Sequence, residues 1–363
     1  MKLSEIAKLA KVSTATVSRT INRVPTVDPV LARRVWRIID RVGYYPNTQA
    51  RALVSGRSRI FGLIVSEISN PFFPEIVQTF TQLGSKHNYE ILLTSIEQDS
   101  KLLETAARRM IERRVDGVAI LTFLHDDSLI EAFSKRNLPV FTIDADSPGH
   151  LLKTVRLDYQ HGIRQAVQHL AALGHVHIAF VSGPAHLKTA AMRRAAFQAC
   201  MKEIGLATPP ELAVEGDHTI EAGMKAMSAL ASLSTRPSAV VCSNDLTAIG
   251  IMRQAFELSL DVPRDLSVVG FDDIRLAQFI IPPLTTVQMS QTEIAETAFT
   301  ALLESVECER TPSSPEVDVI KTHLVLRRST SLAPHRRRQT GAVQDQLAAT
   351  EQGRAPRESR RFF

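Results

Sequence analysis

The sequence has few cysteines and few aromatic residues. Three cysteines, one tryptophan and 6% aromatic residues occur in 363 positions. Cys200, Cys242 and Cys308 lie far apart and are odd in number, which argues against a disulfide framework and against the short ligand spacing of a zinc site. Such cysteine usage fits a reducing compartment, so we expect a cytoplasmic protein.

Long apolar runs are missing as well. No segment approaches the roughly 18 uninterrupted apolar residues of a membrane span, and the start MKLSEIAKLAKV interrupts its apolar residues with charge, unlike a signal peptide. No GxGxxG or GxxxxGK[ST] phosphate loop follows a strand, and no nucleophile, base and oxyanion arrangement emerges. We therefore expect a soluble, unexported protein that is not an enzyme and that needs no cofactor and no metal.

The sequence does have 44% hydrophobic residues and an uneven charge distribution. Its length exceeds the roughly 250 to 300 residues at which single cores stop growing, so two or three domains are expected. The first 58 residues carry 11 Lys and Arg against 3 Asp and Glu, and the last 33 carry 7 against 3. Because the whole chain has a net charge of +5, the part between them is near −7. A basic head on an acidic body indicates a polyanion partner for the head only.

Three short helices are expected in the basic head. The first ends at Lys11, Ser13 is a suitable N-cap for the second, and Asp28 followed by Pro29 begins the third, which ends at Gly43. The expected buried positions are Leu3, Ile6, Ala7, Leu9, Ala10, Val17, Ile21, Val30, Val35, Ile38, Ile39 and Val42. Two short helices joined by a tight turn and braced by a third make a helix-turn-helix, whose second helix enters the major groove. The alternative is a small helical bundle with a solvated face.

Two segments of the head resemble one known family. LSEIAKLAKVSTATVSRTIN resembles the N-terminal helix-turn-helix of the lactose-repressor (LacI/GalR) family, and YYPNTQARALVSGRS resembles its hinge, at the family's spacing. Further matches in LGHVHIAFVSGP, SVVGFDD and IPPLTTVQMS extend the resemblance to about Leu332. One departure is Lys11, where the family usually has glycine in the turn. A left-handed backbone there would cost about 1 kcal/mol.

The resemblance implies roles for the exposed face of the second helix. It implies that Thr14, Ala15 and Arg19 read bases, with Arg19 able to give guanine a bidentate contact. Thr16 and Ser18 are expected to touch phosphate, which fixes register without reading sequence.

The resemblance also implies a hinge over roughly residues 47 to 54. A helix this short is marginal alone, so we expect it to order only with DNA and a second chain present. Its expected DNA-binding residues are Asn47, Ala50 and Leu53, and Leu53 would wedge between base steps in the minor groove. The alternative is a plain linker whose Leu53 packs on the body.

From about residue 59 to 328 short apolar runs alternate with amphipathic stretches, which is typical of doubly wound parallel sheets. The candidate strands are IFGLIV, EILLTSI, GVAIL, PVFTI, HIAFVSG, AVVCS and LSVVGF. The expected fold is an all-α helix-turn-helix head on an α/β body that resembles periplasmic binding proteins. The expected domains are 1–46 for the head, 47–58 for the hinge, 59–330 for the effector-binding and dimerisation domain, and 331–363 for a disordered basic tail. Within the body we expect subdomains of 59–158 with about 289–318, and of 159–288 with about 319–330.

Ligands bind such sheets at the carboxyl ends of the strands, so the residues just after each run are the candidates. The expected effector-binding residues, assigned from the strand ends and from the resemblance, are Asn70, Phe72, Asp144, Arg193, His218, Asn244 and Asp272. The alternatives are that Asn244 and Asp272 cap the helices that follow, and that His218 faces solvent. In the family an aromatic residue is common at His218, and imidazole brings its own hydrogen-bonding atoms.

These features together predict a homodimeric transcriptional regulator, most often a repressor in this family. We expect it to bind a pseudo-palindromic operator under the control of a small polar effector, a sugar or a sugar derivative. The alternatives are a purine- or nucleoside-responsive regulator of the same fold, and a solute-binding protein. The arginine-rich tail has no leucine heptad, so we expect a dimer, with the tail either solvated or adding nonspecific affinity for DNA.

Overall fold

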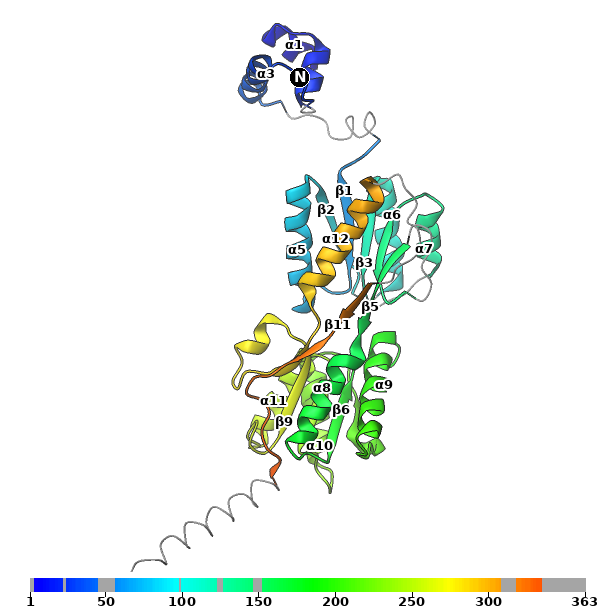
Figure 1. The fold of residues 1–363 in the computed structure, drawn as a ribbon, viewed down its shortest axis with the longest axis vertical. Helices are drawn as coiled ribbons and strands as arrows, with labels where there is room; N and C mark the ends of the chain where they lie inside the picture. The colour runs from blue at the N-terminus through cyan, green and yellow to red at the C-terminus, as the bar shows by residue number, and fades with distance from the viewer. Residues whose placement is uncertain are drawn as a thin grey trace, which may run out of the picture. The chain divides into compact units, whose positions relative to one another are not determined.

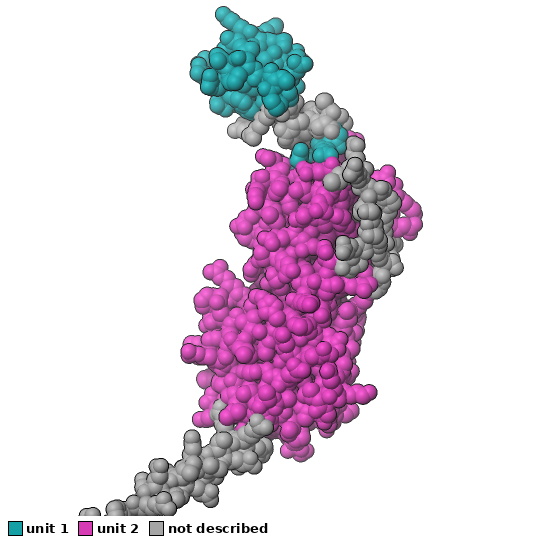
Figure 2. Space-filling view, viewed as in Figure 1, with its two compact units in different colours: residues 1–59 teal, residues 60–363 magenta. Residues whose placement is uncertain are grey.

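The computed structural model describes residues 3–21, 24–44, 56–97, 99–122, 127–145, 152–307 and 318–334. The chain divides into two compact units, residues 1–59 and 60–363 (Figure 2). The expected hinge residues Asn47, Ala50 and Leu53 lie outside the described residues, as does the tail beyond residue 334.

The head consists of the three expected helices, α1 (Leu3–Ala10), α2 (Thr14–Ile21) and α3 (Pro29–Val42). The expected caps are confirmed. The Ser13 hydroxyl accepts a hydrogen bond from the Thr16 amide at 3.0 Å, and Asp28 accepts bonds from the first amides of α3. Gly43 ends α3 in a left-handed conformation with φ 59°. These side chains satisfy amides that would otherwise lack partners, which fixes where α2 and α3 begin.

The core of the head is smaller than the apolar pattern predicts. Its buried residues are Ile6, Ala7, Ala10, Val17, Ile21, Val35 and Ile39. Leu3, Leu9 and Val30 were expected to be buried and are 37%, 54% and 62% exposed. The eight-residue α1 buries only Ile6, Ala7 and Ala10, and α3 reaches the core only from Val35 onward.

The body contains two six-stranded sheets, in the orders β11-β5-β4-β3-β1-β2 and β12-β10-β9-β8-β6-β7. The strands of the first sheet are β1 (Ile60–Val65), β2 (Glu90–Ser95), β3 (Gly117–Leu121), β4 (Val140–Ile143), β5 (Leu152–Asp158) and β11 (Asp318–Lys321). Those of the second are β6 (Ile178–Ser182), β7 (Ala213–Glu215), β8 (Ala239–Cys242), β9 (Ser267–Asp272), β10 (Thr285–Gln288) and β12 (His323–Val325). All pairings are parallel except β10 with β12. The expected class, two parallel-sheet α/β subdomains behind a helix-turn-helix head, is confirmed.

Helices cover the sheets of both subdomains (Figure 1). They are α5 (Phe72–His87), α6 (Ser100–Glu112), α7 (Asp127–Ser134), α8 (Tyr159–Ala172), α9 (Lys188–Glu203), α10 (Ile220–Ala231), α11 (Asp245–Glu257) and α12 (Gln291–Glu307), with 3-10 turns η1 (Pro210–Leu212) and η2 (Arg275–Gln278). Within the described residues, no helix has the length and apolarity to cross a membrane.

The chain passes between the two sheets three times. It crosses from β5 into α8, from β10 into α12, and from β11 into β12. Helix α12 returns to the first subdomain, where the Phe299 ring meets Phe61 and Phe80 edge-on at centroid distances of 5.5 and 5.3 Å. The third crossing was expected near residue 318 and lies after Lys321, because β11 still pairs with β5.

Candidate functional site

The exposed face of α2 carries the residues expected to read DNA. Thr14, Ala15 and Arg19 are exposed, while Thr16 and Ser18 are half-buried. The opposite face of the helix, Val17, Thr20 and Ile21, is buried in the head core, so the most exposed side chains are those expected to read bases. The Thr16 hydroxyl is 2.9 Å from the Ser13 hydroxyl, which leaves it at the start of the helix, where phosphate contacts are common. These DNA contacts stay predictions.

Lys11 lies in the turn between α1 and α2 with a φ of 51°, in the left-handed region. The amides of Lys11 and Val12 donate to the carbonyls of Lys8 and Ala7 at 3.2 and 3.0 Å, which ends α1. The turn therefore has the backbone for which glycine is best suited.

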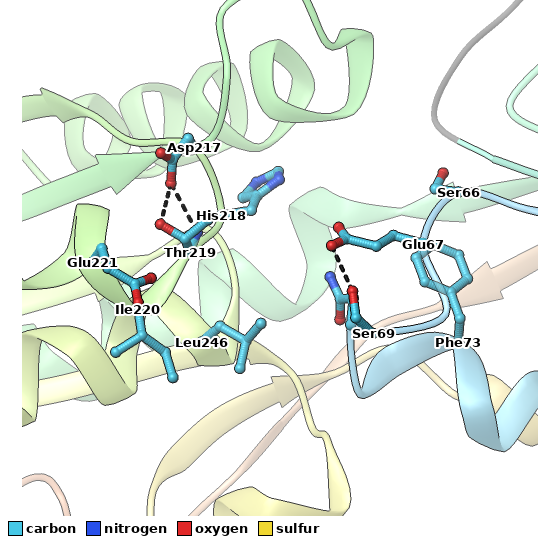
Figure 3. Close-up of a pocket in the computed structure, with 11 residues that line it drawn as sticks. Ser66, Glu67, Ser69, Phe73, Asp217, His218, Thr219, Ile220, Glu221 and Leu246 are labelled. Carbon is cyan, nitrogen blue, oxygen red and sulfur yellow. Dashed lines mark hydrogen bonds between the residues drawn. The ribbon is translucent and has the colours of Figure 1, made fainter. Parts of the chain in front are cut away.

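A cavity of about 230 Å³ lies between the two subdomains of the body (Figure 3). It is lined by Ser66, Glu67, Ser69, Asn70, Phe73, Asp217, His218, Thr219, Ile220, Glu221 and Leu246. The first five follow β1 or begin α5, and the next five follow β7 or begin α10. Both groups lie beyond the carboxyl ends of parallel strands, where ligands of such folds bind.

Asn70 and the start of α5 form the wall of the cavity on the side of the first subdomain. The Asn70 side chain accepts a hydrogen bond from the Phe72 amide at 3.1 Å, and the Asn70 carbonyl accepts one from the Phe73 amide. The Phe72 ring is buried in the core and packs edge-on against Phe73. In this arrangement Phe73, rather than Phe72, lines the cavity.

His218 forms part of the opposite wall of the cavity, and its backbone is held by Asn244. Its carbonyl accepts a hydrogen bond from the Asn244 side-chain amide at 2.9 Å, while the Asn244 oxygen accepts from the Thr247 amide. Asn244 therefore caps α11, as the alternative interpretation predicts, and also fixes the loop that carries His218. His218 has a φ of 69°, and a Cβ on Gly183 would lie 1.9 Å from its Nε2, so the ring fits only because Gly183 lacks a side chain.

The His218 imidazole is neutral at physiological pH. Burial, followed by the nearby Arg193 charge, lowers its pKa to about 3. Its Nε2 atom is buried and has no hydrogen-bond partner among the described residues. The solvent-facing alternative therefore does not describe this side chain.

Arg193 does not line the cavity and lies in a buried cluster near His218. Its Nη1 donates to the Ser243 carbonyl and is 3.5 Å from Asp272 Oδ1. The guanidinium lies over the Phe271 and Tyr159 rings, at 4.1 and 5.2 Å from their centroids. Its Nε is buried without a partner among the described residues. An unpaired buried donor of this kind is costly, and a ligand that reached it would remove that cost.

Asp272 faces Arg193, and among the described residues its side chain caps no helix. Burial raises the pKa of Asp272 to about 7, against the opposing effect of Arg193. Like Asp144 and His218, it has a positive φ, here 107°.

Asp144 connects the first subdomain to the crossing into α8. Its carboxylate accepts hydrogen bonds from the Leu157 amide at 2.9 Å and the Tyr159 hydroxyl at 2.8 Å. Burial and the Asp144 charge raise the pKa of Tyr159 well above its ordinary value, so the hydroxyl stays a donor. Asp144 thus links the end of β4 to the crossing from β5 into α8, and Lys188 Nζ contacts its carbonyl at 3.4 Å.

Asp245, next to Asn244 in the chain, is a fully buried carboxyl in the same region that the sequence did not single out. It accepts hydrogen bonds from the Ile274 amide at 2.8 Å and the Thr286 hydroxyl. Burial and the neighbouring Asp272 raise its pKa well above the ordinary value. It links the start of α11 to β10 and η2 beneath the cleft.

The structure thus brings the expected effector residues to one region, although in different layers. Asn70 and His218 line the cavity, whereas Phe72, Asp144, Arg193, Asn244 and Asp272 are buried around it. The other lining residues lie within a few positions of predicted ones, as Glu67 and Phe73 do around Asn70. Their position just after a strand is the signal that could have identified them.

Comparison with known proteins gives the family. Residues 2–47 match the model of bacterial regulatory proteins of the lacI family, and residues 167–330 match a periplasmic binding protein-like domain. The HTH-type transcriptional repressor CytR of Escherichia coli (strain K12) is 33% identical over 334 residues, covering 92% of this chain and 97% of its own. The chain belongs to the LacI family.

Solved structures of LacI-family proteins agree with this assignment. The lac repressor dimer bound to operator and an anti-inducer superposes with a TM-score of 0.80 at 25% identity, covering 91% of this chain and 99% of its own. A complex of the transcriptional regulator CelR with cellobiose gives 0.68 at 28% identity, with the same coverage. The protein is therefore a DNA-binding transcriptional regulator of the LacI family rather than an enzyme, and the solute-binding alternative is set aside.

Proposed function

We propose that this LacI-family protein is a homodimeric repressor that binds a pseudo-palindromic operator and responds to a small polar effector in the cleft. The observation that carries the effector part is the cavity between the two sheets, lined from both subdomains. A ligand that contacts residues of both subdomains binds better to one relative orientation of the subdomains than to another. It therefore shifts the equilibrium between these orientations.

The chemistry of the cleft supports a hydroxyl-rich ligand. Carboxylates, amides and hydroxyls dominate the lining, as in Glu67, Asn70 and Thr219. The related CelR structure contains cellobiose, which makes a sugar or sugar derivative the first candidate. A nucleoside is the second candidate, because the amide, hydroxyl and carboxylate groups of the lining can also form hydrogen bonds with a ribose and a base.

DNA binding by α2 and control by the cleft require separate tests. For the cleft, the full chain is screened by thermal shift against sugars, sugar acids, polyols, purines and nucleosides. A ligand at 100 times its dissociation constant should stabilise the folded state by about 2.7 kcal/mol. We expect one compound class to raise the melting temperature and Asn70→Ala, which removes a side chain of the lining, to reduce the rise. A rise that Asn70→Ala leaves intact would contradict this site.

The dimer is tested by sedimentation of the full chain with and without a palindromic duplex. We expect two chains per duplex, because each half-site accepts one α2. Binding of a single chain per duplex would contradict the dimeric part of the proposal and leave the family assignment unchanged.

A further inference from the structure

One face of α3 carries a row of arginines that takes no part in the core of the head. Arg33, Arg37 and Arg41 follow one another at intervals of four residues, and all three are exposed. Each lies two positions from a buried residue of the same helix, Val35 or Ile39, which places it about 160° round the helix from the core. These three residues, the arginine stripe, therefore point away from α1 and α2.

The arginine stripe has no counter-charge within the head. No ion pair joins any of the three arginines to another described residue. Asp40 is the one acid in the sequence of α3 and is itself exposed. Like charges four residues apart on a helix repel each other and destabilise it. The stripe is therefore an arrangement that α3 by itself does not favour.

Exposed cations of the body show the opposite arrangement. Lys135 pairs with Glu131, and Arg253 pairs with Glu257, in each case four residues away along the chain. Pairs of this kind are neutral and stabilise a helix. In the arginine stripe, the position four residues from each arginine holds another arginine. Clustered cations without internal partners on one face are typical of a surface that meets a polyanion.

The phosphates of duplex DNA match the arginine stripe in chemistry and in spacing. The planar guanidinium presents a fork of donors that fits phosphate oxygens. With a rise of 1.5 Å per residue the stripe extends over about 12 Å, while one strand of a duplex carries a phosphate every 3.4 Å or so along the axis, roughly three over that length. Because the head belongs to a DNA-binding family, a duplex is the polyanion that it meets.

The arginine stripe does not lie on the face of the head that reads bases. The exposed face of α2 holds Thr14, Ala15 and Arg19, and its opposite face is buried in the head core. Since α2 and α3 turn their buried faces toward the same core, their outer faces point in different directions. The phosphates within reach of the stripe therefore belong to backbone beyond the base pairs that α2 contacts.

We propose that the arginine stripe of α3 binds the phosphate backbone of the operator flanks, one flank for each chain of the dimer. This inference rests on the proposed binding of a dimer to a pseudo-palindromic operator, and it assigns a second DNA-binding surface to the head. Contacts to phosphate position a protein without reading sequence, so the stripe adds affinity and leaves the sequence preference unchanged. A flank that bends toward the head brings its backbone to this face.

The test compares two lengths of one duplex. The sequence that the full chain enriches from random duplexes is prepared as its two half-sites alone, and again with about ten more base pairs, one helical turn, on each side. Fluorescence anisotropy of the full chain at several salt concentrations gives the affinity for each. We expect the longer duplex to bind more tightly, with a slope of log affinity against log salt that is steeper by about 0.9 for each added phosphate contact.

A variant without the arginine stripe should lose this dependence on length. Arg33→Gln, Arg37→Gln and Arg41→Gln combined should bind both duplexes as the wild type binds the short one. Arg108→Gln, Arg109→Gln and Arg113→Gln combined remove the same charge from exposed positions at the end of α6 in the body and should keep the dependence. The fluorescence of Trp36, which lies in α3, checks that the head of each variant is folded.

Three results would overturn the inference: a stripe variant that keeps the dependence on length, one that weakens both duplexes equally, or an α6 variant that loses the dependence as well. The first would indicate an acidic protein surface as the partner of the stripe. Capture of a second short duplex by the bound wild type, lost in the stripe variant, would overturn the flank as the source of the phosphates. Specific binding of the half-sites with no gain from length overturns this inference alone, whereas absence of specific binding overturns the proposed operator binding.

Discussion

At the scale of single residues, Lys11 is the position where the sequence and the backbone disagree. Its φ of 51° is left-handed, and a side chain there costs about 1 kcal/mol relative to glycine. We expect Lys11→Gly to stabilise the head by about that amount. The only tryptophan of the chain, Trp36 in α3, reports unfolding of the head within the full protein by its fluorescence.

Lys8→Gly provides the matched control for this prediction. Lys8 is exposed inside α1, where glycine should destabilise the helix by about 1 kcal/mol. If both substitutions change the unfolding midpoint in the same direction, the left-handed turn is not the source of the effect.

His218 gives a prediction that depends on pH. Its Nε2 is buried and unpaired and its ring already lies against Gly183, so the shorter His218→Leu, which removes the titrating group without adding atoms there, should stabilise the body by up to about 1 kcal/mol near neutral pH. The folded pKa of about 3 lies below the ordinary value of 6.5. Between these values the unfolded chain binds more protons, so the wild type loses stability as the pH falls below 6.5. Differential scanning calorimetry should show the gap between variant and wild type widening toward acid.

Asp272 acts in the opposite sense, since its pKa is raised to about 7, but it is present in both proteins and cancels in the comparison. His177→Gln, at an exposed histidine, should not reproduce the widening. A gap that stays constant from neutral to acid pH would show that His218 is not held in its neutral form.

At the scale of elements, the close packing of α10 on α11 positions the wall of the cavity in the second subdomain. A Cβ on Gly250 of α11 would lie 2.0 Å from the Ile220 carbonyl oxygen of α10, and a Cβ on Gly223 would lie 2.2 Å from the Thr247 carbonyl. Gly250→Ala should therefore push the helices apart and destabilise the body by about 1 to 3 kcal/mol. It should also weaken effector binding, because Ile220 lines the cavity.

Ser228→Ala serves as the control on the same helix. Its hydroxyl is exposed and bonds only to the Met224 carbonyl, so stability and binding should change little. Calorimetric unfolding with equal midpoints for Gly250→Ala and the wild type would show that the two glycines do not set the helix spacing.

Elements that depend on local chemistry could be predicted from the sequence. Ser13 and Asp28 mark the starts of α2 and α3 because they satisfy amides within their own turn, and buried runs such as IFGLIV mark central strands. Five strands escaped prediction. The strands β7, β11 and β12 have only three or four residues at sheet edges and carry no clear periodicity, β10 is four mostly polar residues, and charged residues interrupt the apolar pattern of β5. Their position depends on partners far away in the sequence.

For the site, the sequence predicted which residues follow a strand, but it did not predict the direction in which their side chains point. Asn70 was predicted from its position after β1, whereas His218 was assigned from the family resemblance, since β7 was not predicted. That Arg193 points at Ser243 and Asp272 instead of into the open cavity depends on tertiary packing against Phe271. Likewise, the role of Asp144 at the crossing from β5 into α8 depends on Tyr159, a contact that no local pattern specifies.

At the scale of the whole molecule, the uneven charge makes duplex binding sensitive to salt. Each phosphate neutralised by the basic head should add about −0.9 to the slope of log affinity against log salt on duplex DNA. We expect Arg19→Ala to reduce affinity for a specific site more than for random duplex, because bidentate contacts to guanine carry about 1 to 3 kcal/mol of discrimination. Fluorescence anisotropy at several salt concentrations measures both terms.

The most direct test is selection from a pool of random duplexes with the full chain, carried out in parallel with Arg19→Ala. If α2 reads the major groove in a dimer, the wild type should enrich one sequence made of two inverted half-sites. Each half-site should contain a guanine whose preference is relaxed in the variant. Enrichment of no common sequence by the wild type, or of the same sequence with the same preference at every position by both proteins, would contradict the assignment of α2 as the element that reads DNA.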